Sequence, residues 1–330
     1  MTQAPVSPWA GLRSTFLDSL DAGDQLRIFD LSARTAQTLH RCAARYPLIR
    51  RVRVWPVALS VAAAAPYSSV EALISTARLN LWVFTFDDLF DEERVPLSEL
   101  MRRAERYRAI ALDEPTTAAR DSLATALSEI RADLASYPLF PALGQEWARA
   151  LCGTIDGMTQ EYEWRRAYRS DKSTALPSYE EYLVAGRYSV GGPPHVWASL
   201  ITTNDPSTPQ HLDHLRPMER MASTCIRLAN DLQSYAKELR EGKINALVIL
   251  SQALRQQGYS VEEAYRQAEA RVRLDIERGL QSLGQLRADS RTLTQRPEAA
   301  IADIARFVCD FYVEHDYHTF VMGRTPEAGS

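Results

Sequence analysis

Apolar residues recur at helical spacing along almost the whole chain, and no two alternating segments are joined by an Asn-Gly or Asp-Gly turn. Capping-box sequences, in which a serine stands three residues before a glutamate, occur at Ser68 with Glu71 and at Ser178 with Glu181. Further helix boundaries are expected at Pro217, Gly242, Ser260 and Pro297. The pattern predicts an all-α protein with no sheet.

No internal repeat, linker-like tract or sharp change of composition divides the 330 residues. We expect a single domain of about ten to twelve helices over residues 1–330, with flexible ends at 1–7 and 323–330. Hydrophobic residues make up 45% and charged residues 24%, as in an ordinary globular protein. The net charge of −4 gives no electrostatic basis for nucleic-acid binding.

The longest apolar stretch, residues 54–65, is too short to span a bilayer, so no membrane insertion is expected. The N-terminus lacks the apolar core of a signal peptide, which predicts a cytoplasmic protein. The four cysteines lie far apart and are expected to be buried thiols. Surface histidines, rather than metal ligands, are expected at His211, His214, His315 and His318.

Five carboxylates fall within residues 87–93, after a segment that is apolar on nearly all sides and is predicted to be a buried helix. The helix dipole makes each acidic side chain at a helix C-terminus destabilising by roughly 0.3–1 kcal/mol. Asp87 and Asp91 are four residues apart, and Asp88 and Asp91 are three apart, so their side chains are expected on one face. Clustered carboxylates suit Mg²⁺. The alternative is a solvated acidic helix end.

A second polar stripe lies on the helix expected to start near Pro217. Asn230, Ser234 and Glu238 follow at intervals of four residues, and their amide, hydroxyl and carboxylate oxygens are hard donors that also suit Mg²⁺. Lys237 lies one residue from this stripe and would favour an anionic ligand. An ordinary polar helix face is the alternative.

Together, the sequences DDLFD at 87–91 and NDLQSYAKE at 230–238 resemble the two metal motifs of class I terpene synthases. Their separation of 139 residues (230 minus 91) also fits that family. The resemblance implies an all-α helical bundle around a deep apolar cavity, with the motifs on opposite walls of its mouth. It further implies a trinuclear Mg²⁺ cluster, for which Mn²⁺ could substitute, that holds a substrate diphosphate. Its ligands would be Asp87, Asp88, Asp91, Asn230, Ser234 and Glu238.

Between the motifs, a helix expected over 178–188 is followed by Gly-Gly-Pro-Pro at 191–194, a sequence that breaks a helix. A plain turn between helices is one interpretation. The resemblance implies another, in which Arg187, 43 residues before Asn230 (230 minus 187), binds the diphosphate and Gly191 marks the catalytic break. The planar fork of arginine suits phosphate oxygens.

The remaining expectations concern substrate contacts. Arg187 and Lys237 would neutralise the leaving diphosphate, and aromatic rings would stabilise the carbocation. The candidate rings are those of Trp82, Phe84, Phe86, Trp197, Phe307 and Phe311. The family's C-terminal Arg-Tyr pair is absent, and Tyr317 is expected to take the place of its tyrosine. The Phe-x-x-Pro element of bacterial sesquiterpene synthases is missing too, which favours a C20 substrate.

The sequence therefore predicts a Mg²⁺-dependent terpene synthase, a lyase that ionises and cyclises geranylgeranyl diphosphate, linear or bicyclic. A sesquiterpene synthase acting on farnesyl diphosphate is an alternative. So is an isoprenyl diphosphate chain-elongation enzyme of the same fold, although Asn230 and Ser234 replace its second Asp-rich motif. A non-catalytic, metal-stabilised helical module is the alternative from another class. Assembly as a homodimer is left open.

Overall fold

The computed structural model describes residues 12–92, 95–116, 121–171 and 175–320, and all regular structure in these ranges is helical. The expected flexible ends, 1–7 and 323–330, lie outside these ranges. The described α-helices number thirteen, above the ten to twelve expected, because a helix of a single turn precedes α2. They are α1 (Thr15–Asp18), α2 (Ala22–Arg45), α3 (Val54–Ala64), α4 (Val70–Asp91), α5 (Leu97–Leu112), α6 (Ser122–Ala135), α7 (Phe140–Ser170), α8 (Tyr179–Ser189), α9 (Gly192–Thr203), α10 (Leu212–Glu241), α11 (Ala246–Gln256), α12 (Val261–Ala288) and α13 (Arg296–Glu314). Two 3₁₀ turns, η1 (Arg51–Arg53) and η2 (Thr208–His211), precede α3 and α10.

Most predicted helix boundaries are confirmed. The capping box at Ser178 is complete, Ser260 caps α12, and Gly242 ends α10 with φ of 65°. Two boundaries are wrong. The cap of α4 is Ser69, one residue later than predicted, because its Oγ accepts from the backbone N–H of Ala72. Pro217 lies inside α10 and not in its first turn, because η2 leads directly into the helix at Leu212.

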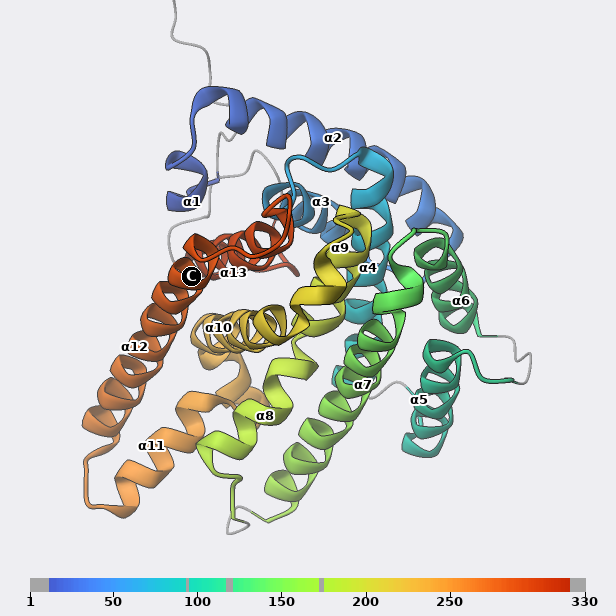
Figure 1. The fold of residues 1–330 in the computed structure, drawn as a ribbon. Coiled ribbons are helices and arrows are strands. Elements are labelled where there is room, and N and C mark those ends of the chain that lie inside the picture. The colour runs from blue at the N-terminus through green and yellow to red at the C-terminus, as the bar shows by residue number, and fades with distance from the viewer. Residues whose placement is uncertain (1–11, 93–94, 117–120, 172–174, 321–330) are drawn as a thin grey trace, which may run out of the picture.

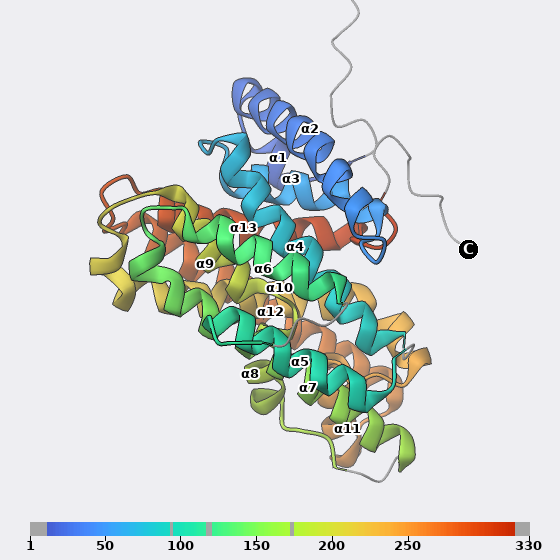
Figure 2. The same ribbon diagram turned by 90° about the vertical axis from the view of Figure 1, so that its right-hand side faces the viewer.

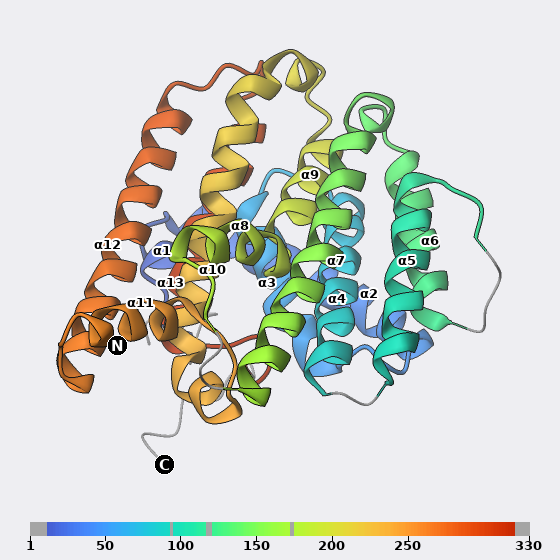
Figure 3. The same cartoon turned by 90° about the horizontal axis from the view of Figure 1, so that it is seen from below.

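Helix α10 lies in the middle of the molecule and packs against α8, α12 and α13 (Figure 1). Helices α1, α2 and α3 gather at one end, as seen in Figures 1 and 2. Viewed from below, α4, α7, α9 and α10 form a central group, with α12 on one side and α5 and α6 on the other (Figure 3). The two predicted metal motifs are thus carried by two central helices.

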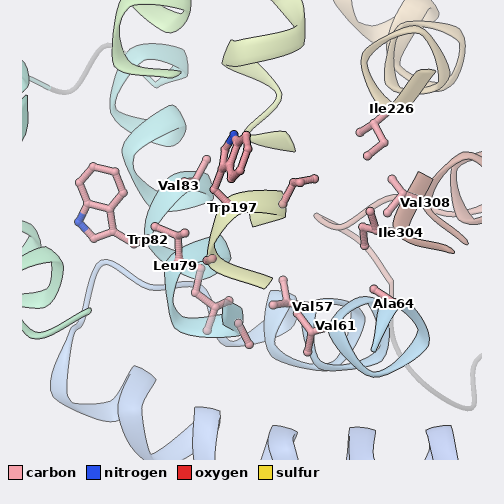
Figure 4. Close-up of a cluster of buried hydrophobic side chains, with 14 of the residues drawn as sticks. Val57, Val61, Ala64, Leu79, Trp82, Val83, Trp197, Ile226, Ile304 and Val308 are labelled. Atoms are coloured by element: carbon pink, nitrogen blue, oxygen red, sulfur yellow. The ribbon is translucent and has the colours of Figure 1, made fainter. Parts of the chain in front are cut away.

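The hydrophobic core runs between these central helices. Helices α3, α4 and α9 are buried on nearly all sides, as expected for helices inside a large domain. Side chains from α3, α4, α9, α10 and α13 converge in Figure 4, among them Val61, Val83, Ile226 and Val308. This arrangement places apolar walls beside the last turns of α4.

Two of the cysteines, Cys225 and Cys309, are buried as expected, whereas the other two are partly exposed. The expectation of surface histidines is wrong for His214 and His315, because neighbouring helices cover both side chains. Among the described residues, no helix combines the length and apolar character needed to cross a membrane.

Candidate active site

A pocket of about 120 Å³ lies where the two motifs meet, between α4, α7, α10 and the segment after α13. Asp87 and Asp91 reach it from the last turns of α4, and Asn230, Ser234 and Glu238 reach it from α10. The stripe on α10 and the acids of α4 therefore face one another across a single pocket, which we call the polar pocket. Its basic side chains are Arg165, Arg227, Lys237 and Lys243.

Asp87 is a carboxyl group that has no ion-pair partner among the described residues, although the charge of Lys243 nearby favours its ionised form. No hydrogen bond or ion pair joins its side chain to another described residue. Burial and the neighbouring charge of Asp91 raise the pKa of Asp87 to about 8. A divalent cation in the pocket would supply the charge that this group lacks.

Asp91, one turn further along α4, is held by two cations. Its oxygens lie 2.7 Å from Lys243 Nζ and 3.1 Å from Arg165 Nη1. Burial alone would raise the pKa of Asp91, but Lys243 and Arg165 hold it below its usual value. Sequence analysis missed both cations, because Arg165 is far from either motif in sequence and Lys243, five residues after Glu238, falls outside the second motif.

Asp88 is not in the polar pocket, contrary to the expectation that it binds metal with its neighbours. Arg53 of η1 binds it with two hydrogen bonds, of 2.8 and 2.7 Å, and Arg50 adds a contact of 3.2 Å. Arg53 is only 1% exposed and stacks over the ring of Phe84. Because successive residues on a helix are about 100° apart, Asp88 points toward η1 while Asp87 points into the pocket. We infer a structural role for Asp88.

The stripe on α10 carries its own hydrogen bonds. Ser234 Oγ donates to the Asn230 carbonyl at 2.8 Å, and Asn245 Nδ2 donates to Glu238 Oε2 at 2.9 Å. Lys237 is exposed and lines the pocket. Asp231, between the first two ligands, is fully buried and accepts from the Tyr182 hydroxyl at 2.9 Å, so it supports the helix and does not face the pocket.

The donor set fits Mg²⁺. Among the described residues, no three His, Cys, Asp or Glu side chains are close enough to hold a metal by themselves. Magnesium usually takes only one or two carboxylates and completes its shell with water and substrate phosphates. Asp87 on one wall and Asn230, Ser234 and Glu238 on the other supply such a set.

The arginines that line the polar pocket are Arg165 and Arg227, whereas Arg187, which the sequence predicted to bind the diphosphate, does not line it. Arg187 lies over the Tyr188 ring at 4.8 Å, and its Nε is buried without a partner. On α8 the neighbouring Gly186 faces Arg227, since a Cβ on Gly186 would lie 3.1 Å from Arg227 Cγ. The side chain of residue 187 therefore points about 100° away. Arg227 Nη1 pairs with Glu161 Oε1 at 3.2 Å.

Behind the polar pocket is a smaller cavity of about 50 Å³, which we call the apolar chamber. The two share Val83, Phe84, Val190 and Tyr312. The predicted break of the helix forms one wall, since α8 ends at Ser189 and α9 starts at Gly192. Gly191 has φ of 79°, and a Cβ there would lie 2.7 Å from Val83 Cγ1. Glycine can adopt this positive φ without strain and has no Cβ that would collide with Val83.

A family model described as terpene synthase family 2, C-terminal metal binding, matches residues 78–278, which contain both motifs and the break. The chain belongs to this terpene synthase family. Curated relatives include kaurene synthase like 2 from Isodon rubescens, 26% identical over 203 residues, or 57% of this chain and 25% of the relative. Pristinol synthase from Streptomyces pristinaespiralis is 26% identical over 217 residues, or 60% of this chain and 53% of the relative. The chain thus spans between a quarter and about half of these relatives.

The fold is also that of solved terpene synthases. The linalool/nerolidol synthase of Streptomyces clavuligerus in complex with 2-fluorogeranyl diphosphate superimposes with a TM-score of 0.66 at 20% identity, covering 86% of this chain and 94% of that chain. Hedycaryol synthase in complex with HEPES gives a TM-score of 0.58 at 21% identity, covering 86% and 90%. The all-α class I terpene synthase fold expected from the sequence is confirmed.

Few of the expected aromatic rings line the cavity. Phe84 lines both the polar pocket and the apolar chamber. The rings of Trp82, Phe86, Trp197, Phe307 and Phe311 line neither and are buried in the core. Trp82 turns away from Trp197 in Figure 4, and its indole N–H donates to the Leu123 carbonyl at 2.8 Å. The sequence of an all-round apolar helix does not indicate which face meets a cavity.

Tyr317 lies in the apolar chamber rather than at the diphosphate side, against the expectation that it replaces the tyrosine of the missing Arg-Tyr pair. Its hydroxyl is 2.5 Å from Ser60 Oγ. The C-terminal side chains that do reach the polar pocket are Tyr312, Asp316 and His318. Sequence analysis missed these three, because the pairing of α13 with α10 brings them there.

Proposed function

We propose that this terpene synthase is a Mg²⁺-dependent class I lyase that ionises an isoprenyl diphosphate and cyclises the resulting carbocation. One observation carries the proposal: the acids of α4 and the oxygen stripe of α10 line the same pocket, and an apolar chamber adjoins it. Such a site binds a charged head group beside an apolar tail.

The diphosphate is the part of the substrate that the polar pocket binds. Asp87, Asn230, Ser234 and Glu238 would hold the metal, with Asp91 joining when Lys243 releases it. Bound Mg²⁺ would act as a Lewis acid toward the leaving diphosphate, three ions being expected from the family and Mn²⁺ being a substitute. Arg165 and Arg227 are held by hydrogen bonds to the Phe90 carbonyl and the Tyr182 hydroxyl before the reaction, so they would stabilise charge on the leaving group with little reorganisation.

The carbon chain would enter the apolar chamber. The face of Phe84 offers a negative quadrupole to a carbocation. The last carbonyls of α8, beside Val190, carry the partial negative charge of a helix C-terminus. Both features favour positive charge in the chamber.

The substrate we propose first is the C20 geranylgeranyl diphosphate, linear or bicyclic, supported by the missing Phe-x-x-Pro element. Farnesyl diphosphate is the second candidate, because a chamber of about 50 Å³ is small for a ligand site and favours the shorter chain. The proposed location is the cytoplasm.

The experiment is incubation of the purified protein with Mg²⁺ and each of geranyl, farnesyl, geranylgeranyl and bicyclic C20 diphosphates, with and without isopentenyl diphosphate. Inorganic diphosphate release and the extracted hydrocarbons and alcohols are measured. Release together with cyclic terpenes supports the proposal, whereas longer isoprenyl diphosphates, formed only with isopentenyl diphosphate, would identify a chain-elongation enzyme. Glu238→Gln should lose turnover, and the matched change Glu262→Gln, on the exposed first turn of α12, should retain it.

A further inference from the structure

The apolar chamber contains one polar pair that the proposed ionisation does not use. Asn80 of α4 and His195 of α9 both line it, among walls such as Val83, Ile226 and Ile304. His195 Nδ1 lies 2.8 Å from Asn80 Nδ2 and 3.0 Å from Asn80 Oδ1. The pair is placed by the packing of α9 on α4.

The other ring nitrogen of His195 has no partner. His195 is only 5% exposed, and Nε2 is buried without a hydrogen bond to any described residue. A buried polar atom left unpaired destabilises a fold, so such an atom calls for an explanation. By contrast, the other polar pair of the chamber is satisfied, because Ser60 Oγ donates to the Pro56 carbonyl and meets the Tyr317 hydroxyl.

The contact with Asn80 permits two tautomers of His195. If the amide N–H₂ donates to Nδ1, then Nε2 carries a hydrogen and presents positive charge. If Nδ1–H donates to the amide oxygen, then Nε2 presents a lone pair. Because His195 lines the chamber, a carbocation held there favours the second arrangement, in which Nε2 carries a lone pair and no hydrogen.

The Asn80 end of the chamber is distant from the site proposed for the diphosphate. Asn80 precedes Asp87 by seven residues on α4, which places it about 10 Å away along the helix axis. A proton acceptor has to be within hydrogen-bond reach of the proton it removes. Diphosphate held beside Asp87 therefore does not reach a carbon at the Asn80 end of the chamber.

We propose that His195 is the proton acceptor that ends the carbocation cascade, and that Asn80 is the positioning residue that fixes its tautomer. The inference rests on the proposed function. A C–H bond next to the cationic carbon breaks, its electron pair becomes the second bond of a C=C double bond, and the proton goes to the lone pair of Nε2. The product is an olefin whose double bond lies where the hydrogen within reach of Nε2 is lost.

The surroundings of His195 suit an acceptor that is neutral before the reaction and releases its proton afterwards. Burial lowers the pKa of His195 to about 4, so the imidazole enters the cycle unprotonated. The imidazolium is a strong enough acid to pass its proton to the released diphosphate or to water when the product leaves. Pro193 and Pro194 at the start of α9 remove two N–H groups that would otherwise present positive charge near the chamber.

The test compares wild type, His195→Phe, Asn80→Leu and the double variant. The control is His214→Phe, because His214 is also buried with an unpartnered Nε2 but lines neither the polar pocket nor the apolar chamber. Each preparation is assayed for thermal melting, Mg²⁺-dependent diphosphate release and the composition of the terpene extract. His195→Met replaces His195→Phe if the larger ring prevents folding. Wild type is also assayed in H₂¹⁸O.

We expect wild type to give mainly one olefin. His195→Phe should still release diphosphate, but the main olefin should give way to a mixture of double-bond isomers. Asn80→Leu should change the products in the same direction, and the double variant should match His195→Phe, because both changes remove one function. His214→Phe should keep the wild-type composition.

An unchanged terpene composition in His195→Phe would overturn the inference. A wild-type product that is an alcohol carrying ¹⁸O would also overturn it, because Asn80 and His195 would then bind the water that ends the reaction. A loss of stability with no change in products would indicate a purely structural pair and would overturn it too. A wild-type protein that releases no diphosphate from any substrate would instead overturn the proposed function.

Discussion

Removing the negative charge of Asp87 should stabilise the metal-free protein. The folded protein binds a proton at Asp87 with a pKa of about 8, against an ordinary value of 3.8. Between these two values the folded state holds a proton that the unfolded chain has lost, so stability falls as the pH rises through this window. Asp87→Asn, which keeps the shape and has no charge, should not show that fall.

The size of the effect follows from the distance between the two pKa values. Each pH unit between them corresponds to about 1.4 kcal/mol, which sets an upper limit of roughly 6 kcal/mol above pH 8. Water entering the open pocket and relaxation of the site reduce this penalty. We therefore expect Asp87→Asn to gain about 1–3 kcal/mol at pH 8 and almost nothing at pH 4. At roughly 2 °C per kcal/mol, the melting temperature should rise by a few degrees at pH 8.

Asp88→Asn provides the matched control, one residue along the same helix turn. Asp88 is paired with the buried Arg53, so the substitution leaves an uncompensated guanidinium and should cost about 3–5 kcal/mol. The assay is thermal unfolding from pH 4 to pH 8.5 in chelator, followed by product analysis with Mg²⁺. Asp87→Asn should be stable but inactive. An Asp87→Asn protein that melts lower than wild type at every pH, and still makes product, would refute the reasoning.

Three further outcomes are expected. Arg227→Lys should lose most turnover, because an ammonium does not reproduce the forked contacts to Tyr182 and Glu161, whereas Arg187→Lys should stay near wild type. Steady-state kinetics at saturating Mg²⁺ compare the two variants. A greater loss of turnover in Arg187→Lys than in Arg227→Lys would return Arg187 to the diphosphate site. Gly191→Ala should lower both the melting temperature and turnover. Gly284→Ala, at an exposed helix position with open space around the new Cβ, should raise the free energy of unfolding by about 0.5–1 kcal/mol. Equal effects of the two substitutions on stability would contradict the argument that Gly191 is required at the break. Mg²⁺ and diphosphate together should raise the melting temperature by more than the sum of their separate effects. Melting is measured with neither ligand, with each alone and with both, and additive shifts would argue against a shared site.

The sequence predicted the helical class, the carriers of both motifs and the break between them because these depend on local patterns. Helical periodicity places Asp87 and Asp91 on one face, and both line the polar pocket. The serine caps at Ser178 and Ser260 depend on residues three positions away and are confirmed. Interactions between residues that are close along the chain can be predicted from a single sequence.

Long-range contacts account for the errors. Asp88 shares the local spacing of Asp91, but its partner is Arg53, 35 residues earlier in the chain. Arg187 has the expected separation from Asn230, yet separation along the chain does not fix which face of α8 a side chain occupies. The same holds for Trp82 and Phe86 on the all-round apolar α4, where Phe84 alone among the expected rings of that helix faces the cavity.

The acids at the end of α4 now divide into a structural and a functional set. Their position opposes the helix dipole and brings like charges together, which by itself destabilises the fold. Arg53 compensates Asp88, and Lys243 with Arg165 compensates Asp91, so these two charges are tolerated without metal. Asp87 has no ion pair with any residue that the structure describes, and the nearby charge of Lys243 does not keep its pKa from rising. A protein under selection for stability only would be better with a neutral residue there, and the uncompensated carboxyl is therefore the strongest sign that this pocket binds a cation.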